Sequence, residues 1–413
     1  MKREIKIGIF GLGRGGTLFK SILYNNGNIV AVCDRDEEKL ESARAELGTD
    51  VGLYCDFEKF IEHPGLEAVY LCNNFHQHSE FAIKALKKNI HVLSECTSNA
   101  TMAEGVKLVR AARESKAIYM LADNYPFNKL NKEINRVFKG GTLGKVLYAE
   151  GEYNHPEEPT DTEVIKKYRP YEKHWRNFLP RSYYVTHSLG PLMYVTGAFP
   201  IRVSAMAVFA PKPTDSLMGL DVGDKAAIIT CLNNDGSVFR VTGCSGFGAH
   251  ENSYRICGTR GQIENLRDGS NRIAVSYNKW DTPENMASSF SYVPDWNDKD
   301  SRLIDKSGHG GGDFLVFREF FECIAENKQP FFDVYCSTTM ASVAILAHRS
   351  ILEGGVPYDI PDFHKEEDLV KYENDNLTPF WSGDQAPTLP CCSHPDYKPT
   401  REDVEEYRRV LAE

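Results

Sequence analysis

The first third of the chain alternates short, almost continuous apolar runs with segments in which apolar residues recur at helical spacing. We expect strands at 5–10, 29–34, 52–55, 68–73, 91–95 and 118–123, and helices at 15–25, 36–47, 78–88 and 101–115. Strands that are apolar on both faces and alternate with helices are typical of a parallel sheet covered on both sides. Residues 1–123 are therefore predicted to form an α/β domain with a doubly wound parallel sheet.

The pattern changes after residue 123, where longer runs alternate apolar and polar residues, as in strands with one buried face. We expect strands at 145–155, 202–210, 226–234, 237–244, 253–259 and 272–277, and helices at 127–138, 313–326 and 336–353. Residues 124–365 are therefore predicted to form an α+β domain with a large, mostly antiparallel open sheet. A C-terminal extension, 366–413, ends in a helix that Thr400 and Asp403 should cap.

Composition narrows the class of protein. The chain has 413 residues, of which 41% are hydrophobic and 26% charged, so we expect folded domains rather than disorder. A formal net charge of -10 argues against nucleic acid or an anionic membrane surface as a partner. The 11 cysteines are scattered and odd in number, which indicates free thiols in a reducing compartment. With no signal peptide and no apolar run near the ~18 residues of a membrane span, we predict a cytoplasmic protein.

The segment GIFGLGRGG places Gly11, Gly13 and Gly16 in the G-x-G-x-x-G spacing directly after the first strand. Asp34 ends the second strand and completes a dinucleotide-binding fingerprint. Gly11 should allow the tight turn, Gly13 the approach of the pyrophosphate, and Gly16 the packing of the helix on the strand. Asp34 should bind the adenosine ribose and repel a 2′-phosphate, so we expect NAD over NADP, a preference that Arg35 would soften. A glycine-rich turn without a ligand is the alternative.

Further cofactor contacts are expected at the carboxyl ends of the strands, where ligands bind open α/β sheets. The residues that we assign to NAD, besides the glycines and Asp34, are Arg14, Asn73, His78, Glu95 and Asn124. His78 is expected to brace the loop beside the cofactor rather than to react. Glu95 is expected to hold the nicotinamide ribose or to steer the substrate, and a solvated charge at a strand end is the alternative.

Four segments give the chain a resemblance to a known superfamily. They are GLGRGG in the glycine turn, AVYLCNNFHQHSEFAIKAL at 68–86, NIHVLSECTSN at 89–99 and HRSILEGGVPYDIPDF at 348–363. Together they resemble the Gfo/Idh/MocA superfamily, which includes glucose–fructose oxidoreductase and inositol dehydrogenase. The resemblance implies a Rossmann domain followed by an open sheet that carries the substrate on one side. The other side often forms an oligomer contact, which implies a homodimer or homotetramer.

Two departures from the superfamily concern its usual catalytic residues. The segment 95–97 is Glu-Cys-Thr where the superfamily usually has Glu-Lys-Pro, so the lysine near the nicotinamide is absent. Judged by its spacing to Gly197, the catalytic histidine of the superfamily corresponds to His187, and the position four residues earlier, often an aspartate, holds Tyr183. The histidine is therefore present without its usual lysine and aspartate partners.

The departures make the chain similar to one branch of the superfamily, the NAD-dependent α-N-acetylgalactosaminidases and related glycoside-active members. The similarity rests on YVTHSLGP, on HWR at 174–176 and on GHGGGDF at 308–314, although SECTSN is not the usual wording of that branch. In that branch the histidine and the tyrosine three residues before it serve the reaction. The resemblance therefore implies His187 and Tyr184 as the catalytic residues.

The chemistry of a sugar or glycoside substrate fits this pair. If hydride leaves a ring carbon, carbon 3 in our hypothesis, the hydroxyl must also lose a proton, and a histidine is suited to take it near neutral pH. Tyr184 would be the partner of His187 or a second proton donor. A ketone at carbon 3 acidifies the hydrogen on carbon 2, so elimination, water addition and return of the hydride would give net hydrolysis. We predict an oxidoreductase, with the NAD-dependent glycosidase, a non-catalytic NAD-binding regulator and a purely structural His–Tyr pair as alternatives.

Other residues are assigned to the substrate. Tyr125 follows the sixth strand, Trp175 and Arg176 suit stacking on and hydrogen bonding to a sugar, and His309 lies among glycines. A packing tryptophan beside a surface arginine is the alternative for the second pair.

A metal site is not expected. The segment PCCSHP contains Cys391, Cys392 and His394, but adjacent cysteines are poor tetrahedral ligands and no second Cys/His pair lies nearby in the sequence.

Overall fold

The computed structural model describes residues 3–156, 161–211, 220 and 223–413. Chain packing divides the protein into two compact units. The first unit comprises Met1–Glu133, Pro294–Ala341 and Asp362–Asn374; the second comprises Ile134–Val293, Ser342–Pro361 and Asp375–Glu413. The units are therefore not separated at one point of the sequence, because two late segments belong with the N-terminal sheet.

The sheet of the first unit has six parallel strands, as predicted. They are β1 (Ile5–Phe10), β2 (Gly27–Cys33), β3 (Gly52–Tyr54), β4 (Ala68–Leu71), β5 (His91–Ser94) and β6 (Tyr119–Leu121). Their order is β3-β2-β1-β4-β5-β6, with every pairing parallel. The strand order reverses between β1 and β4, which is where open α/β sheets bind ligands at their carboxyl ends.

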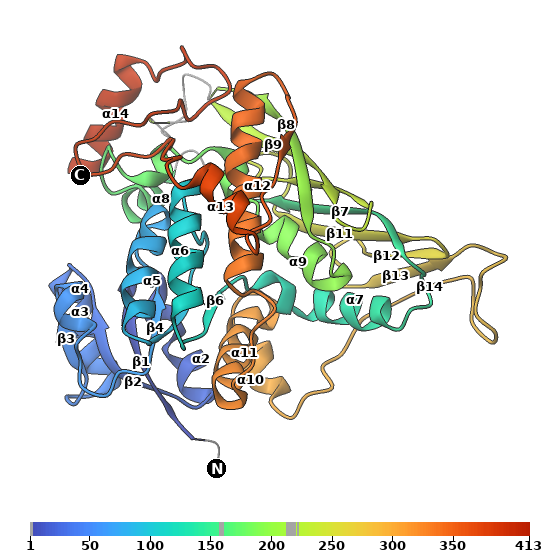
Figure 1. Cartoon of the computed structure of the whole chain (residues 1–413), viewed down its shortest axis with the longest axis horizontal. Helices are drawn as coiled ribbons and strands as arrows, with labels where there is room; N and C mark the ends of the chain where they lie inside the picture. The colour runs from blue at the N-terminus through green and yellow to red at the C-terminus, as the bar shows by residue number, and fades with distance from the viewer. Residues whose placement is uncertain (1–2, 157–160, 212–219, 221–222) are drawn as a thin grey trace. The chain divides into compact units, whose positions relative to one another are not determined.

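Helices follow the strands of the first unit. The N-terminal ones are α1 (Leu12–Gly15), the 3-10 turn η1 (Gly16–Leu18), α2 (Phe19–Tyr24), α3 (Glu37–Leu47), α4 (Phe57–Phe60), η2 (Phe75–Gln77), α5 (His78–Lys87), α6 (Met102–Glu114) and η3 (Tyr125–Phe127). The late ones are α10 (Ser301–Asp305), η6 (His309–Gly311), α11 (Gly312–Glu326) and α13 (Glu366–Tyr372). Helices α5 and α6 lie side by side in Figure 1. A capping box closes the N-terminus of α6, because Thr101 and Glu104 each bond the backbone of the other.

The second unit contains the predicted, mostly antiparallel sheet. Its strands are β7 (Val146–Asn154), β8 (Pro200–Phe209), β9 (Asp224–Asn233), β10 (Val238–Thr242), β11 (Glu251–Gly258), β12 (Gly261–Asn265), β13 (Ile273–Tyr277), β14 (Ser289–Tyr292) and β15 (Tyr358–Asp359). They are ordered β14-β13-β12-β11-β7-β10-β9-β8-β15, and only the pairing of β10 with β7 is parallel among the described strands. Strands β12, β14 and β15 are short or polar, so they have no apolar alternation from which they could be predicted.

Helix α9 (Thr186–Thr196) lies against this sheet, with η5 (Arg181–Tyr184) before it (Figure 1). Two glycines allow direct contact between backbones. A Cβ on Gly151 of β7 would lie 2.0 Å from the carbonyl oxygen of Ser188, and one on Gly243 would lie 1.9 Å from that of Arg181. The helix ends at Gly197, whose φ of 73° is left-handed. The main chain therefore sets the distance of α9 from the sheet.

The remaining helices include two that cross between the units along the chain. These are α7 (Lys129–Lys139) and α12 (Val334–Leu352). The second unit also holds α8 (Thr162–Tyr168), the turn η4 (Trp175–Asn177) and α14 (Arg401–Ala412). Buried Ile165 of α8 packs with Tyr407 and Val410 of α14, and the predicted cap of α14 by Thr400 and Asp403 is present.

Candidate functional site

The glycine turn and Asp34 are joined by a hydrogen bond. The amide of Leu12 donates to Asp34 Oδ2 at 2.6 Å, and the amide of Asp36 donates to Oδ1 at 3.0 Å. Each carboxylate oxygen keeps a further lone pair, which suits the ribose hydroxyls of a nucleotide. Asp34 therefore both holds the turn in place and faces the expected position of the adenosine.

The roles of the three glycines differ in one respect from the expectation. Gly11 has φ 96°, and a Cβ there would lie 2.5 Å from the carbonyl oxygen of Cys72. A Cβ on Gly13 would meet no atom within 4 Å, so the backbone is open to a phosphate. Gly16 is equally open, whereas a Cβ on Gly15 would lie 2.6 Å from Ile9 Cγ2. The helix therefore packs on β1 through Gly15, and the packing role assigned to Gly16 is corrected.

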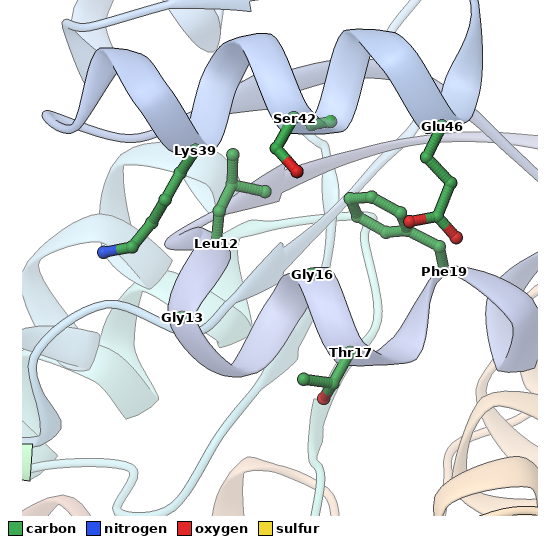
Figure 2. Close-up of a pocket in the computed structure, with 9 residues that line it drawn as sticks. Leu12, Gly13, Gly16, Thr17, Phe19, Lys39, Ser42 and Glu46 are labelled. Carbon is green, nitrogen blue, oxygen red and sulfur yellow. The ribbon is translucent and has the colours of Figure 1, made fainter. Parts of the chain in front are cut away.

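A shallow groove of about 200 Å³ lies beside this turn (Figure 2). Its walls are α3, which contributes Lys39, Ser42 and Glu46, and the helical segment that follows the turn. Ligand pockets for molecules of drug size are typically ~300–1,000 Å³. The groove is too small for a dinucleotide, so we place the cofactor along the turn and Asp34 instead.

The carboxylate of Asp313 gathers three of the predicted site residues in the first unit. Arg14 donates to Oδ1 at 2.6 Å, Asn124 donates to Oδ1 at 2.7 Å, and His309 Nδ1 lies 2.9 Å from Oδ2. The His309 ring also contacts that of Tyr125, with 5.6 Å between centroids. Burial alone would raise the pKa of Asp313, but the bond to His309 and the charge of Arg14 hold that pKa well below its usual range.

The glycine-rich loop 308–312 explains why this gathering is possible. His309 and Gly310 both have positive φ, at 54° and 60°, and Gly311 has φ 97°. A Cβ on Gly312 would lie 2.2 Å from the carbonyl oxygen of Asn124. The loop therefore passes directly over Asn124, shortly after β6, and brings Asp313 to Arg14. Sequence reasoning missed this contact, although it had singled out the segment GHGGGDF.

Glu95 lies in the same network and is no isolated strand-end charge. Its Oε1 accepts from the Tyr70 hydroxyl at 2.6 Å and from Arg14 Nε at 3.4 Å. Burial, then the neighbouring Cys72 and Glu95, raises the pKa of Tyr70, so the phenol keeps its proton and donates it. Arg14 is thus held by Glu95 and Asp313, which directs its side chain to this network.

His78, the first residue of α5, lies between Asn73 in the loop after β4 and Thr97 in the loop after β5. His78 is buried, with Nδ1 2.9 Å from the carbonyl oxygen of Thr97 and Nε2 3.1 Å from that of Asn73. Its position fits a brace between two loops, and burial lowers the pKa of its imidazole. The side-chain amide of Asn73 is shielded, and neither of its polar atoms has a hydrogen-bond partner among the described residues.

These observations fit a bound NAD. The open backbone at Gly13, the free lone pairs of Asp34 and the unsatisfied amide of Asn73 are the groups that phosphates and ribose hydroxyls would satisfy.

The predicted catalytic pair lies in the second unit. His187 is buried in the first turn of α9, and its Nε2 lies 3.3 Å from the hydroxyl of Tyr184. The backbone carbonyl of His187 accepts a bond of 2.6 Å from Tyr254 of β11. The structure therefore brings the two side chains within hydrogen-bonding distance and fixes the helix that carries the histidine.

Aromatic rings that sequence reasoning missed surround the pair. Tyr153 of β7 contacts Tyr184 and His187, with centroid distances of 5.7 and 5.0 Å. Nδ1 of His155, just past β7, lies 2.8 Å from Nδ1 of His250. Alternation along β7 was the available signal, because it points Tyr153 to the face that α9 covers.

Trp175 and Arg176 stack on each other. The guanidinium carbon of Arg176 lies 4.4 Å from the Trp175 ring and 5.5 Å from the Tyr168 ring, and both stacked side chains are partly exposed. Buried Asn177 stabilises the loop that carries this pair, because its side-chain amide donates to the carbonyl oxygens of Tyr171 and Glu172. A stacked, half-exposed pair remains suitable for a sugar.

Comparison with known proteins finds matches to two family models. Residues 5–123 match the oxidoreductase family with an NAD-binding Rossmann fold, and residues 222–369 match the C-terminal domain of glycosyl hydrolase 109. A glycosyl hydrolase family 109 protein of Streptomyces niveus is 26% identical over 397 residues, covering 89% of this chain and 78% of that protein. Another, from Phocaeicola vulgatus, is 21% identical over 410 residues, covering 87% and 94%.

Solved structures show the same fold. Levoglucosan dehydrogenase in complex with NADH and L-sorbose has a TM-score of 0.70 and 17% identity, covering 87% of this chain and 100% of that one. Aldose-aldose oxidoreductase from Caulobacter crescentus, complexed with glycerol, has a TM-score of 0.66 and 18% identity, covering 86% and 100%.

The chain is thus an NAD-binding protein with the fold of the sugar-acting oxidoreductases. Its residues 5–123 match the Gfo/Idh/MocA oxidoreductase family and its residues 222–369 match the glycosyl hydrolase 109 C-terminal domain, which is the combination that the resemblance implied. Within the described ranges, each helix is too short or too polar to span a bilayer.

Proposed function

We propose that the protein oxidises a secondary ring hydroxyl, at carbon 3, of a sugar or glycoside, with His187 as the general base. The observation that carries the proposal is the 3.3 Å distance between His187 Nε2 and the Tyr184 hydroxyl, which is within hydrogen-bonding range. The helix that carries His187 packs its main chain directly against the sheet. Bound NAD supplies the hydride acceptor. His187 takes the hydroxyl proton as the carbonyl forms, and Tyr184 stabilises the charged imidazole or returns the proton.

The first unit is proposed to position the cofactor. Asp34 would hold the adenosine ribose, and the Asp313 network, with Arg14, Asn124 and His309, would line the end of the site at β5 and β6. Glu95 would contact the nicotinamide ribose or the substrate. Trp175 and Arg176, together with Tyr125, would bind the sugar. The 11 cysteines are scattered along the chain and odd in number, which suits the reducing cytoplasm that we propose as the location.

Net hydrolysis is the second candidate function, favoured by the match of residues 222–369 to the glycosyl hydrolase 109 C-terminal domain. The first step is the same. Removal of the carbon 2 proton from the ketone then expels the anomeric alcohol, water adds to the resulting alkene, and the hydride returns to carbon 3. No net NADH would accumulate, whereas simple oxidation yields one NADH for each hydroxyl oxidised.

A panel of p-nitrophenyl glycosides and free sugars separates the two outcomes. Reduced-nicotinamide absorbance that rises with free sugar indicates oxidation, and p-nitrophenol release without net NADH indicates hydrolysis. If neither NADH nor p-nitrophenol forms although NAD is bound, the remaining explanation is a non-catalytic NAD-binding regulator.

The catalytic pair is tested by His187→Ala and Tyr184→Phe, with Tyr183→Phe as the matched control. Tyr183 is fully buried and packs against the rings of His348 and Phe380. Both site variants should bind NAD normally, keep near-native melting, and lose ~10²–10⁴-fold in turnover. The control should turn over within a few-fold of the unmodified protein. If both site variants also turn over substrate within a few-fold of the unmodified protein, and His187→Ala melts at a lower temperature, then the pair only contributes to packing.

A further inference from the structure

Three side chains of types that commonly bind metals lie close together at the start of β9. Asp224 begins the strand, while Cys392 and His394 come from the C-terminal extension. One ligand atom of each lies within 4.8 Å of the others, and Cys392 Sγ lies 3.8 Å from Asp224 Oδ1. The sequence motif alone lacked a third ligand, and the fold supplies it from 168 residues away.

The 3.8 Å between Cys392 Sγ and Asp224 Oδ1 matches the spacing in a tetrahedral zinc site, and the His394 nitrogen, within 4.8 Å of both, would need to move by at most about 1 Å. Zinc binds sulfur at ~2.3 Å, nitrogen at ~2.0–2.1 Å and carboxylate oxygen at ~2.0–2.2 Å, so neighbouring ligands are about 3.3–3.8 Å apart. The ligand types also discriminate between metals. Thiolate and imidazole suit zinc, whereas calcium and magnesium take oxygen ligands.

The surroundings hold the three side chains in place. Asp224 and Cys392 are each only 3% exposed. The His394 ring stacks on Phe209, with centroids 3.7 Å apart and planes 25° apart. The hydroxyl of Ser393 lies between two of the ligands, 2.5 Å from Asp224 Oδ1 and 3.1 Å from His394 Nδ1. The ligands thus need little ordering before a cation binds.

The donors around Asp224 point to a cation rather than to an anchor alone. Its carboxylate accepts from the Ser393 amide at 2.8 Å, from the Ser393 hydroxyl and from the Cys392 thiol, which are neutral groups. Among the residues that the structure describes, the groups that donate to Asp224 are neutral, so its buried charge is weakly compensated, and a metal ion is one of the partners that normally accompany buried charge.

We propose that Asp224, Cys392 and His394 bind a zinc ion, with water as the fourth ligand. The ion would tie the C-terminal extension to the start of β9 and would have a structural role, separate from the proposed sugar chemistry. Binding displaces the thiol proton of Cys392 to solvent, and the Ser393 hydroxyl turns aside from its place between the ligands.

The full-length protein tests the site directly. Protein purified without chelator should contain one zinc per chain by mass spectrometry of the metals. After chelation, added cobalt should give the visible absorption of a tetrahedral ion and a thiolate charge-transfer band. His394→Ala changes an exposed residue, so it should fold; it should bind zinc at least ~100-fold more weakly, because changing outer partners alone costs ~10–100-fold.

Two neighbours serve as controls. Cys391→Ser and Ser393→Ala should keep the zinc content and the cobalt spectrum, because neither side chain is a ligand in the proposed site. Chelation should lower the melting temperature of the unmodified protein and leave that of His394→Ala unchanged. Unmodified protein that binds neither zinc nor cobalt at micromolar concentration would overturn the proposal, as would full binding by His394→Ala or its loss in Cys391→Ser.

Discussion

At the scale of single residues, Asp34 has two tasks that a substitution can separate. Its carboxylate holds the amide of Leu12 and would repel a 2′-phosphate. Asp34→Asn keeps an oxygen for Leu12 but removes the charge, whereas Asp34→Ala removes both. We expect the asparagine variant to narrow the NAD-over-NADP preference by about tenfold, roughly one 1.4 kcal/mol interaction.

Calorimetry with both cofactors measures the effect, and Asp36→Asn, whose carboxylate caps α3, is the neighbouring control. Equal affinity of the unmodified protein for NAD and NADP would remove the discriminating role of Asp34. A loss of NAD binding only in Asp34→Ala would identify the bond to Leu12 as its main contribution.

His348 makes stability depend on pH. The ring is buried, Nε2 lies 2.7 Å from the Pro390 carbonyl, and burial lowers its pKa from 6.5 to about 4. As the pH falls below about 6.5, the unfolded chain binds the proton first, so stability is lost until the folded state titrates near pH 4. The loss at pH 4 should be about 3 kcal/mol, from ~1.4 kcal/mol per pKa unit.

Urea unfolding between pH 7 and pH 4 measures this dependence. His348→Gln keeps a donor for Pro390 but cannot titrate, so its stability should fall less over that range. His364→Gln, at an exposed position, is the control and should follow the unmodified protein. Identical pH curves for all three proteins would show that His348 does not set the acid sensitivity.

Local spacing predicted residues better than it predicted their partners. Short separations along the chain make some features predictable from sequence: the glycine fingerprint, Asp34 and the Tyr184–His187 pair. Arg14 and Asp313 are 299 residues apart, and their contact depends on the path of the whole chain. The same reason explains why Asp224 was not associated with PCCSHP.

At the scale of elements, α6 offers the simplest test because its N-terminus is closed by a complete capping box. The Thr101 hydroxyl accepts from the Glu104 amide at 3.1 Å, and the Glu104 carboxylate accepts from the Thr101 amide at 3.2 Å. Thr101→Ala should destabilise the protein by ~1 kcal/mol. Chemical unfolding measures it, with Thr101→Ser as the conservative variant that should recover most of the loss; an unchanged alanine variant would make the cap dispensable.

Element prediction succeeded where apolar periodicity was strong. β1 was predicted at its observed bounds, and the other predicted strands and helices of the first unit differ from the observed ones by a few residues at their ends. The helix expected at 15–25 begins instead at Leu12 and is interrupted by η1, since the glycines remove the apolar signal there. Strands β14 and β15 lie at the two ends of the sheet, where burial demands little hydrophobicity, and β12 is a short strand with a single large apolar residue, Ile263.

At the scale of the whole molecule, one face of the second sheet carries exposed apolar side chains. Met206 is 67% exposed on β8, Val208 follows on the same face, and Leu232 of β9 lies across from Arg202. Gly151 and its alternate neighbours face α9, so these side chains point to the other side. We expect a second copy to cover this face, giving a homodimer or homotetramer.

Light scattering at micromolar concentration measures the assembly. Met206→Glu should shift it towards the monomer, because a charge would be buried in the interface, while Lys279→Glu, on the loop after β13, should not. A monomer in the unmodified protein would remove the oligomer prediction.

The contact of Gly151 and Gly243 with α9 and η5 has a consequence for tolerance to mutation. Any side chain at either position would meet a carbonyl oxygen at about 2 Å, and that oxygen belongs to main chain that cannot rotate aside. In a saturation library selected for turnover, these two sites should return glycine alone, although neither touches a substrate. Glu150 and Glu152 point to the opposite face of the sheet, where both pair with Arg240, so conservative replacements should be permitted there. A map of permitted residues would then identify the backbone contact that supports α9 independently of the chemistry of His187.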